Sequence, residues 1–214
     1  MIHRDGLADS PRFEDSTCVF CQALEDGVSE RVLPSYNTTL GSTDNFVVLP
    51  ALGPLKKGHV LVVSRAHFPS LGSMTDTAID EFQQLVDAVR PQYDALGGNI
   101  LEAEHGSTNT NSGGSCIIHT HVNLIPGLGH LHRILDRSLR RVDVTLPLRN
   151  LASTHRPYIF MKHENSLAVY DATHARSQLI RRALSTHFGG DDWDWALFPR
   201  LDLVEETITF WRGI

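Results

Sequence analysis

An alternating run of polar and apolar side chains between Ser115 and Pro126 constrains the fold more than any other part of this chain. Alternation with a period of two is typical of a β-strand, whose side chains point to opposite faces in turn. The run therefore predicts that His119, His121 and Asn123 share one face of a strand. Neighbouring polar groups on that face would lie about 6.6 Å apart, so all three can contact one phosphate group and its flanking atoms. Burying such groups without partners costs free energy, which makes this face a candidate site.

The second face of the same strand is expected to contribute to a hydrophobic core. It carries Cys116, Ile118, Val122 and Leu124. The chain has 214 residues, of which 41% are hydrophobic and 21% charged, and this composition is typical of one globular domain plus an extension. A net charge of −6 argues against a surface that coats nucleic acid, whereas a locally positive pocket can still bind a small anion. We therefore expect no nucleic-acid polymer as a partner.

Targeting signals are not visible in the sequence. The residues after Met1 are polar and lack the apolar segment of a signal peptide, and no apolar run approaches the length of a membrane span. Three cysteines are too few for a disulfide framework. These features predict a cytoplasmic location and no membrane partner.

Periodicity predicts the remaining elements and a polar loop before the histidine strand. Apolar residues recur with helical spacing from Thr75, and Pro91 is expected to end that helix. The loop 106–114 has three glycines and no bulky side chain, so its backbone can approach a ligand closely. Further strands are predicted at 44–50, 59–64 and 100–104, a hairpin at 157–161 and 166–170, and helices at 133–141, 175–188 and 201–211.

These motifs, in this order, resemble the histidine triad (HIT) superfamily of nucleotide hydrolases and transferases, whose signature is His-φ-His-φ-His-φ-φ, with φ an apolar residue. Matching features precede the strand in family order: Cys18-x-x-Cys21, Asn45-Phe46, Gly58-His59, Arg65-Ala-His67 and the glycine-rich loop. Two positions depart from the pattern, because Asn123 replaces the third histidine and Ser115 replaces the usual glutamine.

The resemblance implies the fold and the domain organisation. It implies an α+β HIT-like fold, with an antiparallel sheet and a long helix, over residues 15–130. Residues 1–14 are then a flexible lead-in, and 131–214 form an α/β C-terminal extension packed on the core. A homodimer is the expected assembly, because HIT domains commonly pair.

The resemblance also implies a chemistry for the strand, with catalytic residues His121, Asn123 and His119. A neutral imidazole nitrogen of His121 would attack the α-phosphorus of a nucleotide and form a nucleotidyl-histidine. The loop residues Ser112, Gly113, Gly114 and Ser115 would hold the phosphate oxygens through backbone amides. Asn45 would contact the ribose or base by family position. Adenine nucleotides are the favoured substrates.

Asn123 favours nucleotidyl transfer over hydrolysis as the expected reaction. An amide can donate a hydrogen bond to a phosphoryl oxygen but cannot supply a proton as an acid. In branches that resemble galactose-1-phosphate uridylyltransferase, the same position is a glutamine and the acceptor is a phosphate group. We therefore expect transfer or phosphorolysis rather than plain hydrolysis. The alternative is a repurposed domain that binds a nucleotide without turnover.

The cysteine pair Cys18 and Cys21 allows three interpretations. It is a redox motif, a pair of buried cysteines, or half of a zinc site. No thioredoxin-like unit surrounds the pair, which disfavours the first. In zinc-bearing HIT branches the set is completed by two histidines, here His67 and His119, and Cys₂His₂ is a common structural zinc set. The resemblance thus implies a structural zinc ion that orients His119 beside His121.

Several further residues have structural readings that we prefer. His59 is expected to make interior hydrogen bonds, and Cys116 to be a core residue. His105 is expected either to have a structural role or to reach the glycine-rich loop. The tryptophans Trp193, Trp195 and Trp211 are expected to pack the C-terminal extension. The residues His130, His132 and Arg133 are weak candidates to close over a leaving group.

Overall fold

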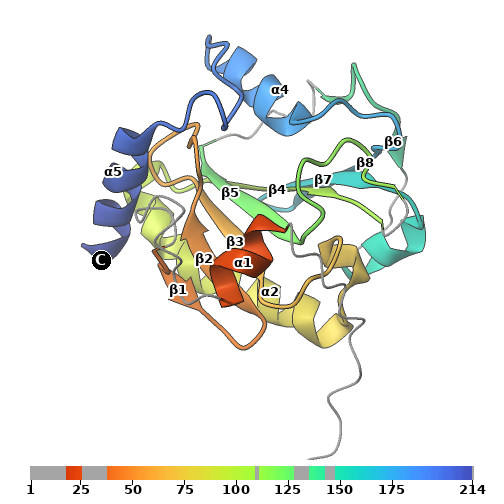
Figure 1. Cartoon of the computed structure of the whole chain (residues 1–214), viewed down its shortest axis with the longest axis horizontal. Coiled ribbons are helices and arrows are strands. Elements are labelled where there is room, and N and C mark those ends of the chain that lie inside the picture. The colour runs from red at the N-terminus through yellow and green to blue at the C-terminus, as the bar shows by residue number, and fades with distance from the viewer. Residues whose placement is uncertain (1–17, 26–37, 109–110, 128–134, 143–147, 214) are drawn as a thin grey trace, which may run out of the picture.

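A computed structural model describes residues 18–25, 38–108, 111–127, 135–142 and 148–213. Its helices and 3-10 helices (η) are α1 (Val19–Glu25), η1 (Leu71–Ser73), α2 (Asp76–Val89), η2 (Arg90–Leu96), η3 (Leu148–Thr154), α4 (Leu179–His187) and α5 (Leu201–Arg212) (Figure 1). Its strands are β1 (Gly41–Ser42), β2 (Phe46–Pro50), β3 (Val60–Ser64), β4 (Ile100–Gly106), β5 (His121–Pro126), β6 (Arg141–Val142), β7 (Tyr158–His163) and β8 (Ser166–Asp171). Within these ranges, no helix has the length and apolar character that a membrane crossing requires.

The strands form one eight-stranded sheet in the order β1-β2-β3-β5-β4-β7-β8-β6. Every neighbouring pair is antiparallel. The predicted α+β class with an antiparallel sheet and a long helix is therefore confirmed. Because side chains alternate along each strand, the sheet presents two different faces to the helices.

The helix α2 covers one face of the sheet, as its sequence pattern predicts. Its buried side chains include the expected residues Ile79, Phe82, Leu85, Val86 and Val89. They pack against strand residues that point to the same side, among them Val122 and Leu124 of β5. The hydroxyl of Thr75 accepts a hydrogen bond from the amide of Ala78 and caps the helix. The α-helix ends at Val89, just before Pro91, which lies in η2 and cannot donate a backbone hydrogen bond.

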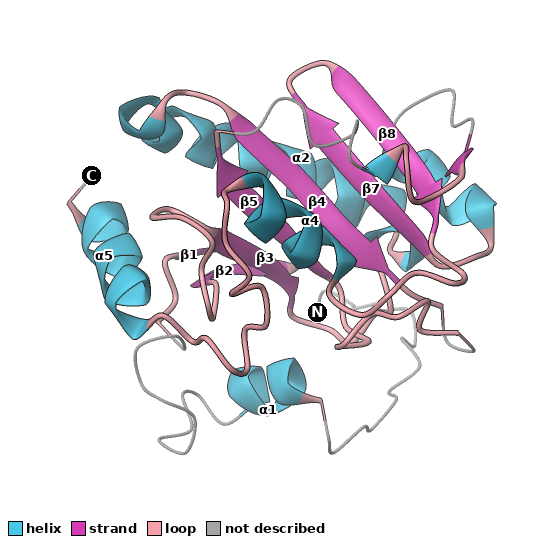
Figure 2. Cartoon of the chain, turned by 90° about the horizontal axis from the view of Figure 1, so that it is seen from above, coloured by secondary structure: helices cyan, strands magenta, loops and turns pink. Residues whose placement is uncertain are grey.

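The opposite face is covered by two separate elements, which leave a gap between them. Residues of α4, including Ile180 and Leu184, pack over β4, β7 and β8. Phe20 of α1 packs over β2 and β3 in a smaller cluster. Figure 2 shows α4 in front of the sheet and α2 behind it, with α1 apart from α4. The uncovered strip runs along β5, which carries the candidate site.

The segment after the histidine strand extends the same sheet. The strand β7 pairs with β4 over six residues, from Leu101 opposite His163 to Gly106 opposite Tyr158. The described part of 131–214 thus continues the sheet, although the boundaries 1–14, 15–130 and 131–214 remain predictions. The sheet ends in β1 and β6, each two residues long. Such short edges offer little backbone for pairing with a second copy, and the homodimer also remains a prediction.

Two predicted helices differ from the structure. Of the helix expected at 133–141, Leu135 is helical, whereas the residues after it form a turn and β6 begins at Arg141, so the helix does not continue to 141; residues 133 and 134 lie outside the described part of the chain. The helix expected at 175–188 begins only at Leu179, because Gln178 has a left-handed backbone with φ of 55°. The turn before Gln178 brings the first turn of α4 over the gap in the sheet face.

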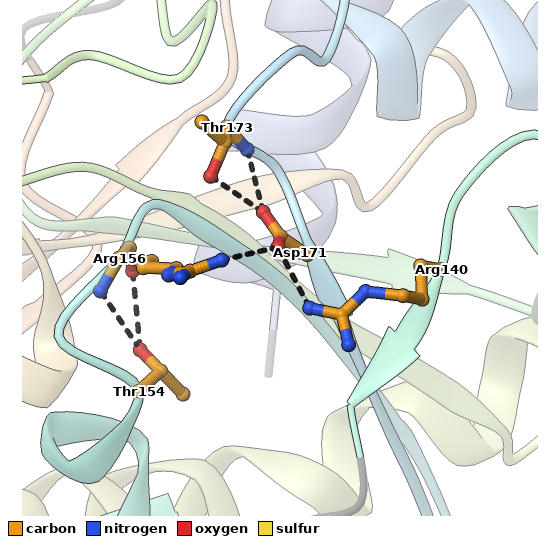
Figure 3. Close-up of polar contacts among 5 residues, drawn as sticks. All are labelled: Arg140, Thr154, Arg156, Asp171 and Thr173. Carbon is orange, nitrogen blue, oxygen red and sulfur yellow. Dashed lines mark hydrogen bonds and ion pairs between the residues drawn. The ribbon is translucent and has the colours of Figure 1, made fainter.

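A polar cluster around Asp171 ties the end of β8 to neighbouring segments. One carboxylate oxygen accepts from the amide and hydroxyl of Thr173, at 3.0 and 2.6 Å. The other accepts from Arg140 at 3.0 Å and Arg156 at 3.4 Å. Figure 3 shows both arginines pointing to this carboxylate, with Thr154 bound to the backbone of Arg156. The hydrogen bonds from Thr173 and the charge of Arg140 lower the pKa of Asp171 below its ordinary value of 3.8.

We expect the substitution Asp171→Asn to lower the free energy of unfolding by about 1 kcal/mol at pH 7. The folded-state pKa is depressed, so this stabilisation is present above the ordinary pKa and is lost as the pH falls below it. Urea unfolding at pH 7 and below pH 4 should show that the difference between wild type and variant shrinks in acid. The control Arg140→Ala, which removes an exposed partner, should cost less than about 0.5 kcal/mol. A variant as stable as wild type at pH 7 contradicts the argument.

Candidate active site

A cavity of about 220 Å³ lies in the gap between α1 and α4. The strand β5 contributes His121 and Asn123 to its wall, and β4 contributes His105. Its remaining lining residues are Val19, Phe20, Ala23, Leu49, Pro50, Ala51, Leu52, Leu61, Ser115, Cys116, Ile117, Gln178, Ile180, Arg181 and Trp195. Most of these side chains are apolar, and a few polar groups converge between them, which is typical of a small-molecule site.

The sheet register explains why these polar side chains converge. Asn123 of β5 lies between Leu61 of β3 and Ala103 of β4. The same antiparallel register, continued by two residues, brings His105 opposite His121. Residues at alternate positions point to the same face, so all of these side chains point toward the gap rather than toward α2.

The backbone determines which nitrogen of His121 is available. Its Nδ1 lies 2.7 Å from the carbonyl oxygen of His119. A carbonyl oxygen only accepts, so Nδ1 carries the proton and Nε2 keeps a free electron pair. Burial lowers the pKa of His121 below its ordinary value of 6.5, so the ring is neutral at pH 7. These two features favour a nucleophilic imidazole.

Asn123 is held by two partners that fix the orientation of its amide. Its Nδ2 donates to the carbonyl oxygen of Ala103 at 3.2 Å, so its Oδ1 must face His59. The Nε2 of His59 therefore donates to Oδ1 at 3.0 Å, while its Nδ1 accepts from the amide of Leu55. Burial, followed by the charge of Arg181, lowers the pKa of His59 to about 3, so this ring stays neutral. One N–H of Asn123 remains for a ligand.

The glycine-rich loop is satisfied largely within itself. The amide of Gly113 donates to Asn111 Oδ1 at 2.8 Å, and the amide of Ser115 donates to the carbonyl of Ser112 at 2.9 Å. The amide of Gly114 donates to the Ser112 hydroxyl at 3.4 Å. Of the four predicted loop residues, Ser115 lines the cavity, and its hydroxyl donates to the carbonyl of Ile117. These amides are therefore not free to hold a phosphate in this conformation.

The two loop glycines are required by the C-terminal extension. Gly113 has φ of 58°, and a Cβ there would lie 2.2 Å from the Cβ of Pro157. Gly114 has φ of 82°, and a Cβ there would lie 2.3 Å from the carbonyl oxygen of Ala175. His105 reaches this loop in a structural role, because its Nε2 donates to the Gly113 carbonyl at 2.7 Å.

Asn45 lies away from the cavity. It is exposed at the turn before β2, and its backbone amide and Nδ2 both donate to the carboxylate of Glu81 in α2. Asn45, which the resemblance implied for nucleotide binding, thus connects a turn to a helix in this structure.

Cys18, Cys21, His67 and His119 come together as one cluster beside the cavity. Their ligand atoms all lie within 4.8 Å of one another. The distance from Cys21 Sγ to His67 Nδ1 is 3.1 Å, and Cys18 Sγ lies 3.4 Å from His119 Nδ1. A tetrahedral zinc ion with ordinary bond lengths separates its ligands by roughly 3.3–3.8 Å, so the cluster fits the ion with small adjustments.

The second nitrogen of His119 supports this fit. Its Nε2 donates to the carbonyl oxygen of Ser64 at 2.7 Å, which leaves the electron pair on Nδ1 directed toward the cysteines. Phe20 packs its ring against His119 and His121, with centroids 5.5 and 5.4 Å away. The cluster therefore connects α1 to the strand that carries His121. His119 does not line the cavity, so its contribution would be through the cluster.

Three sequence expectations differ from this site. Cys116 is exposed and lines the cavity rather than the core, because β5 begins only at His121 and the alternation does not extend back to it. Ile118 is 40% exposed for the same reason. Trp195 lines the cavity, whereas Trp211 is buried against Tyr93 as expected. The candidates His130, His132 and Arg133 lie outside the described residues.

The sequence reasoning did not find the contribution of α4. Gln178 and Arg181 lie more than 50 residues after the histidine strand, in a segment without a recognisable motif. A lone arginine in an amphipathic helix carries no signal of its own, and only the packing of α4 on the sheet brings it to the cavity.

Comparison with known proteins decides the family. Residues 12–134, more than half of the chain, match the family model described as proteins similar to the CwfJ C-terminal region. The chain belongs to this family. The matched region of this CwfJ-like chain includes the histidine strand and the four Cys and His residues of the cluster. It ends before β7 and α4.

Proteins similar to this chain include one that carries a histidine triad name. Over 116 residues the CwfJ-like chain is 22% identical to "Protein hit" of Bacillus subtilis (strain 168). The aligned region covers 52% of this chain and 72% of that protein. A hypothetical histidine triad nucleotide-binding protein of Sulfolobus tokodaii is 22% identical over 51% of this chain and 68% of its own, with a TM-score of 0.39. A hypothetical protein from Leishmania major is 14% identical over 65% and 92%, with a TM-score of 0.43.

Proposed function

We propose that this protein is a nucleotide-processing enzyme that attacks the α-phosphate of a nucleotide through His121 and forms a nucleotidyl-histidine. The observation that carries the proposal is the cavity-lining imidazole whose Nδ1–H is bound by the His119 carbonyl, which leaves Nε2 for the attack. The lowered pKa of His121 supports the same role, because a neutral ring is the nucleophile. The family match adds a histidine-bearing strand in the expected sequence context.

The reaction has two displacements. In the first, the Nε2 electron pair forms a bond to the α-phosphorus, and the bond from phosphorus to the leaving oxygen breaks with its electrons on the leaving group. In the second, an oxygen of phosphate, another acceptor or water attacks the same phosphorus, and the N–P bond returns its electrons to Nε2. Division into two steps lowers each barrier. The apolar lining excludes bulk water, which strengthens every polar contact at the phosphorus.

Asn123 supports transfer over hydrolysis in this proposal. Its remaining N–H can donate to a phosphoryl oxygen, but the amide cannot deliver or remove a proton. An acceptor that already carries negative charge, such as phosphate, needs no base to attack. Water does need one, so the site favours an anionic acceptor.

We expect the substitution Asn123→His to raise the share of product formed by hydrolysis. General acid–base catalysis typically contributes about a hundredfold or more, so an added imidazole should make water a competitive acceptor. The measurement is the ratio of hydrolysis to phosphorolysis products with one donor at fixed phosphate. The matched control Asn123→Gln keeps an amide and should keep the wild-type ratio. An unchanged ratio in Asn123→His contradicts this role of Asn123.

The proposal is tested by intact mass after brief mixing with a panel of nucleotide donors. The quench must avoid acid, because a phosphoramidate is labile there. The expected result is an added mass equal to one nucleotidyl group, which also identifies the base. Adenine nucleotides are the first donors to try. Donors that stay unconsumed, with no adduct on the protein, overturn the proposal.

A second candidate function is nucleotide binding without turnover. It is favoured by two observations: the loop amides of Gly113 and Ser115 already have acceptors, and one N–H of Asn123 already donates to the Ala103 carbonyl. A site of this kind has fewer free donors for the transition state. It predicts that nucleotides raise the Tm while no product forms at any acceptor concentration.

A further inference from the structure

Arg181 is a cation in the wall of the cavity that has no acidic partner there. The described residues that line the cavity include no aspartate, glutamate or lysine, so Arg181 gives this lining its one formal charge. Among the described residues, none of the ion pairs includes Arg181; the charges of Asp194 and Arg200 act on it, but neither residue lines the cavity. The chain as a whole has a net charge of −6. A locally positive cavity on an acidic protein indicates an anionic ligand.

The guanidinium is positioned by backbone groups, which leave part of it free. Its Nε donates to the carbonyl of Trp193 at 2.8 Å, and Nη2 donates to the carbonyl of Gly53. A guanidinium has five N–H groups, and the other three have no acceptor among the described residues. Two carbonyls restrict the side chain without neutralising it, so the free edge is pre-organised to bind oxygen atoms.

Arg181 lies on the Asn123 side of the cavity. Its charge contributes to the lowered pKa of His59, and His59 is hydrogen-bonded to Asn123 at 3.0 Å. The described lining contains no other permanently charged side chain, and the rings of His105 and His121 in the same wall each bind a backbone carbonyl, of Gly113 and of His119. An anion in this cavity therefore finds one cation, next to the amide of Asn123.

We propose that Arg181 forms a phosphate-binding subsite for the part of the substrate that does not become attached to His121. The inference rests on the proposed function for its place in the reaction. The ligand of this subsite is a phosphate group in either case. It belongs either to the leaving group of the donor, which is pyrophosphate or phosphate, or to the phosphate that enters as the acceptor. Arg181 lies outside the residues 12–134 that match the family, so this subsite belongs to the C-terminal extension of the chain. The extension thereby determines which phosphate-bearing leaving group or acceptor takes part in the reaction at His121.

The test is calorimetric titration of the full chain with inorganic phosphate and, separately, with pyrophosphate, at constant ionic strength. We expect Arg181→Gln to weaken binding at least about tenfold, as loss of a charge-assisted bidentate contact does. The matched control Arg182→Gln removes the same charge from the next residue of α4, whose guanidinium stacks on Trp193 and does not line the cavity. It should bind as wild type does. Arg181→Lys keeps the charge but loses the bidentate geometry of the guanidinium, so this variant should bind the anion with intermediate affinity.

The two anions distinguish the source of the group. Binding of pyrophosphate in preference to phosphate assigns the subsite to the leaving group, and the reverse assigns it to the acceptor. If neither anion binds wild type, or if Arg181→Gln binds as well as Arg182→Gln, the proposal is overturned.

A second measurement uses the wild-type protein and avoids any effect of substitution on folding. Cys116 is exposed and lines the same cavity. An anion bound at Arg181 should slow alkylation of Cys116 by a maleimide several-fold, whereas chloride at equal ionic strength should not. An unchanged rate at a saturating anion concentration contradicts the subsite.

These experiments do not depend on turnover. Anion binding through Arg181 with no nucleotidyl adduct means that the subsite stands and the proposed function fails. An adduct on His121 without Arg181-dependent anion binding means that the proposed function stands and the subsite fails.

Discussion

The substitution His121→Ala is expected to abolish the nucleotidyl adduct and to lower kcat at least about 10³-fold, as removal of a nucleophile does in covalent catalysis. The fold should be retained, because His121 is only partly buried and, among the described residues, its side chain makes one hydrogen bond, to the backbone of His119. Zinc content should also be retained, since His121 is not part of the cysteine–histidine cluster. Intact mass, steady-state kinetics and metal analysis on one preparation check all three statements.

The pH dependence of the proposed reaction in the wild-type protein provides an independent check on the same residue. The nucleophile must be neutral, and burial lowers the pKa of His121 below its ordinary value of 6.5. The rate should therefore fall in acidic solution with a midpoint below pH 6.5. As a control, His174→Ala removes an exposed histidine on a turn and should leave both the adduct and the profile unchanged. A variant His121→Ala that keeps the wild-type rate would exclude nucleotidyl-histidine chemistry.

Loss of the metal is expected to have the second large effect, through α1. This helix is seven residues long, too short to be stable by itself, and Phe20 is buried in a small cluster with Val47, Leu49 and Val63. The four ligands of the proposed zinc site would attach the helix to the rest of the fold. We expect Cys21→Ser to lower the free energy of unfolding by about 3 kcal/mol, which corresponds to a fall in Tm of roughly 6–12 °C.

The same change should weaken ligand binding without touching His121 directly. The helix α1 supplies Val19, Phe20 and Ala23 to the cavity wall, and the ring of Phe20 packs on His121. When α1 is no longer held, the cavity loses this wall and admits water. Nucleotide affinity should therefore fall together with Tm, both in Cys21→Ser and after chelation of the wild type.

Metal analysis and thermal unfolding with and without a chelator provide the measurement. The control is Cys116→Ser, which alters the third cysteine of the chain, outside the cluster, and should keep one zinc ion per chain. Wild-type protein that contains no metal, or whose Tm a chelator does not change, would show that the cluster has no structural ion.

Local patterns of the sequence predicted the elements near the strand and much of the site. The spacing of Ile79, Phe82 and Val86 indicated the helix α2, because that face had to be buried. Alternation along β5 placed His121 and Asn123 on one face, since side chains on a strand alternate whatever the tertiary fold. The four residues of the cysteine–histidine cluster were predicted from their resemblance to a ligand set, and they lie together.

Tertiary structure alone decided which groups are free to act. The amides of the glycine-rich loop have partners within the loop, and Asn45 faces Glu81, since hydrogen-bond partners depend on how distant segments pack. Arg181 comes to the cavity because Gln178 adopts a left-handed backbone and α4 then packs over β4. By itself, the sequence determined the polar face of the strand and the place of His121 on that face. The fold determined the walls and the charge around that face, because these come from residues far apart in the chain that only packing brings into contact.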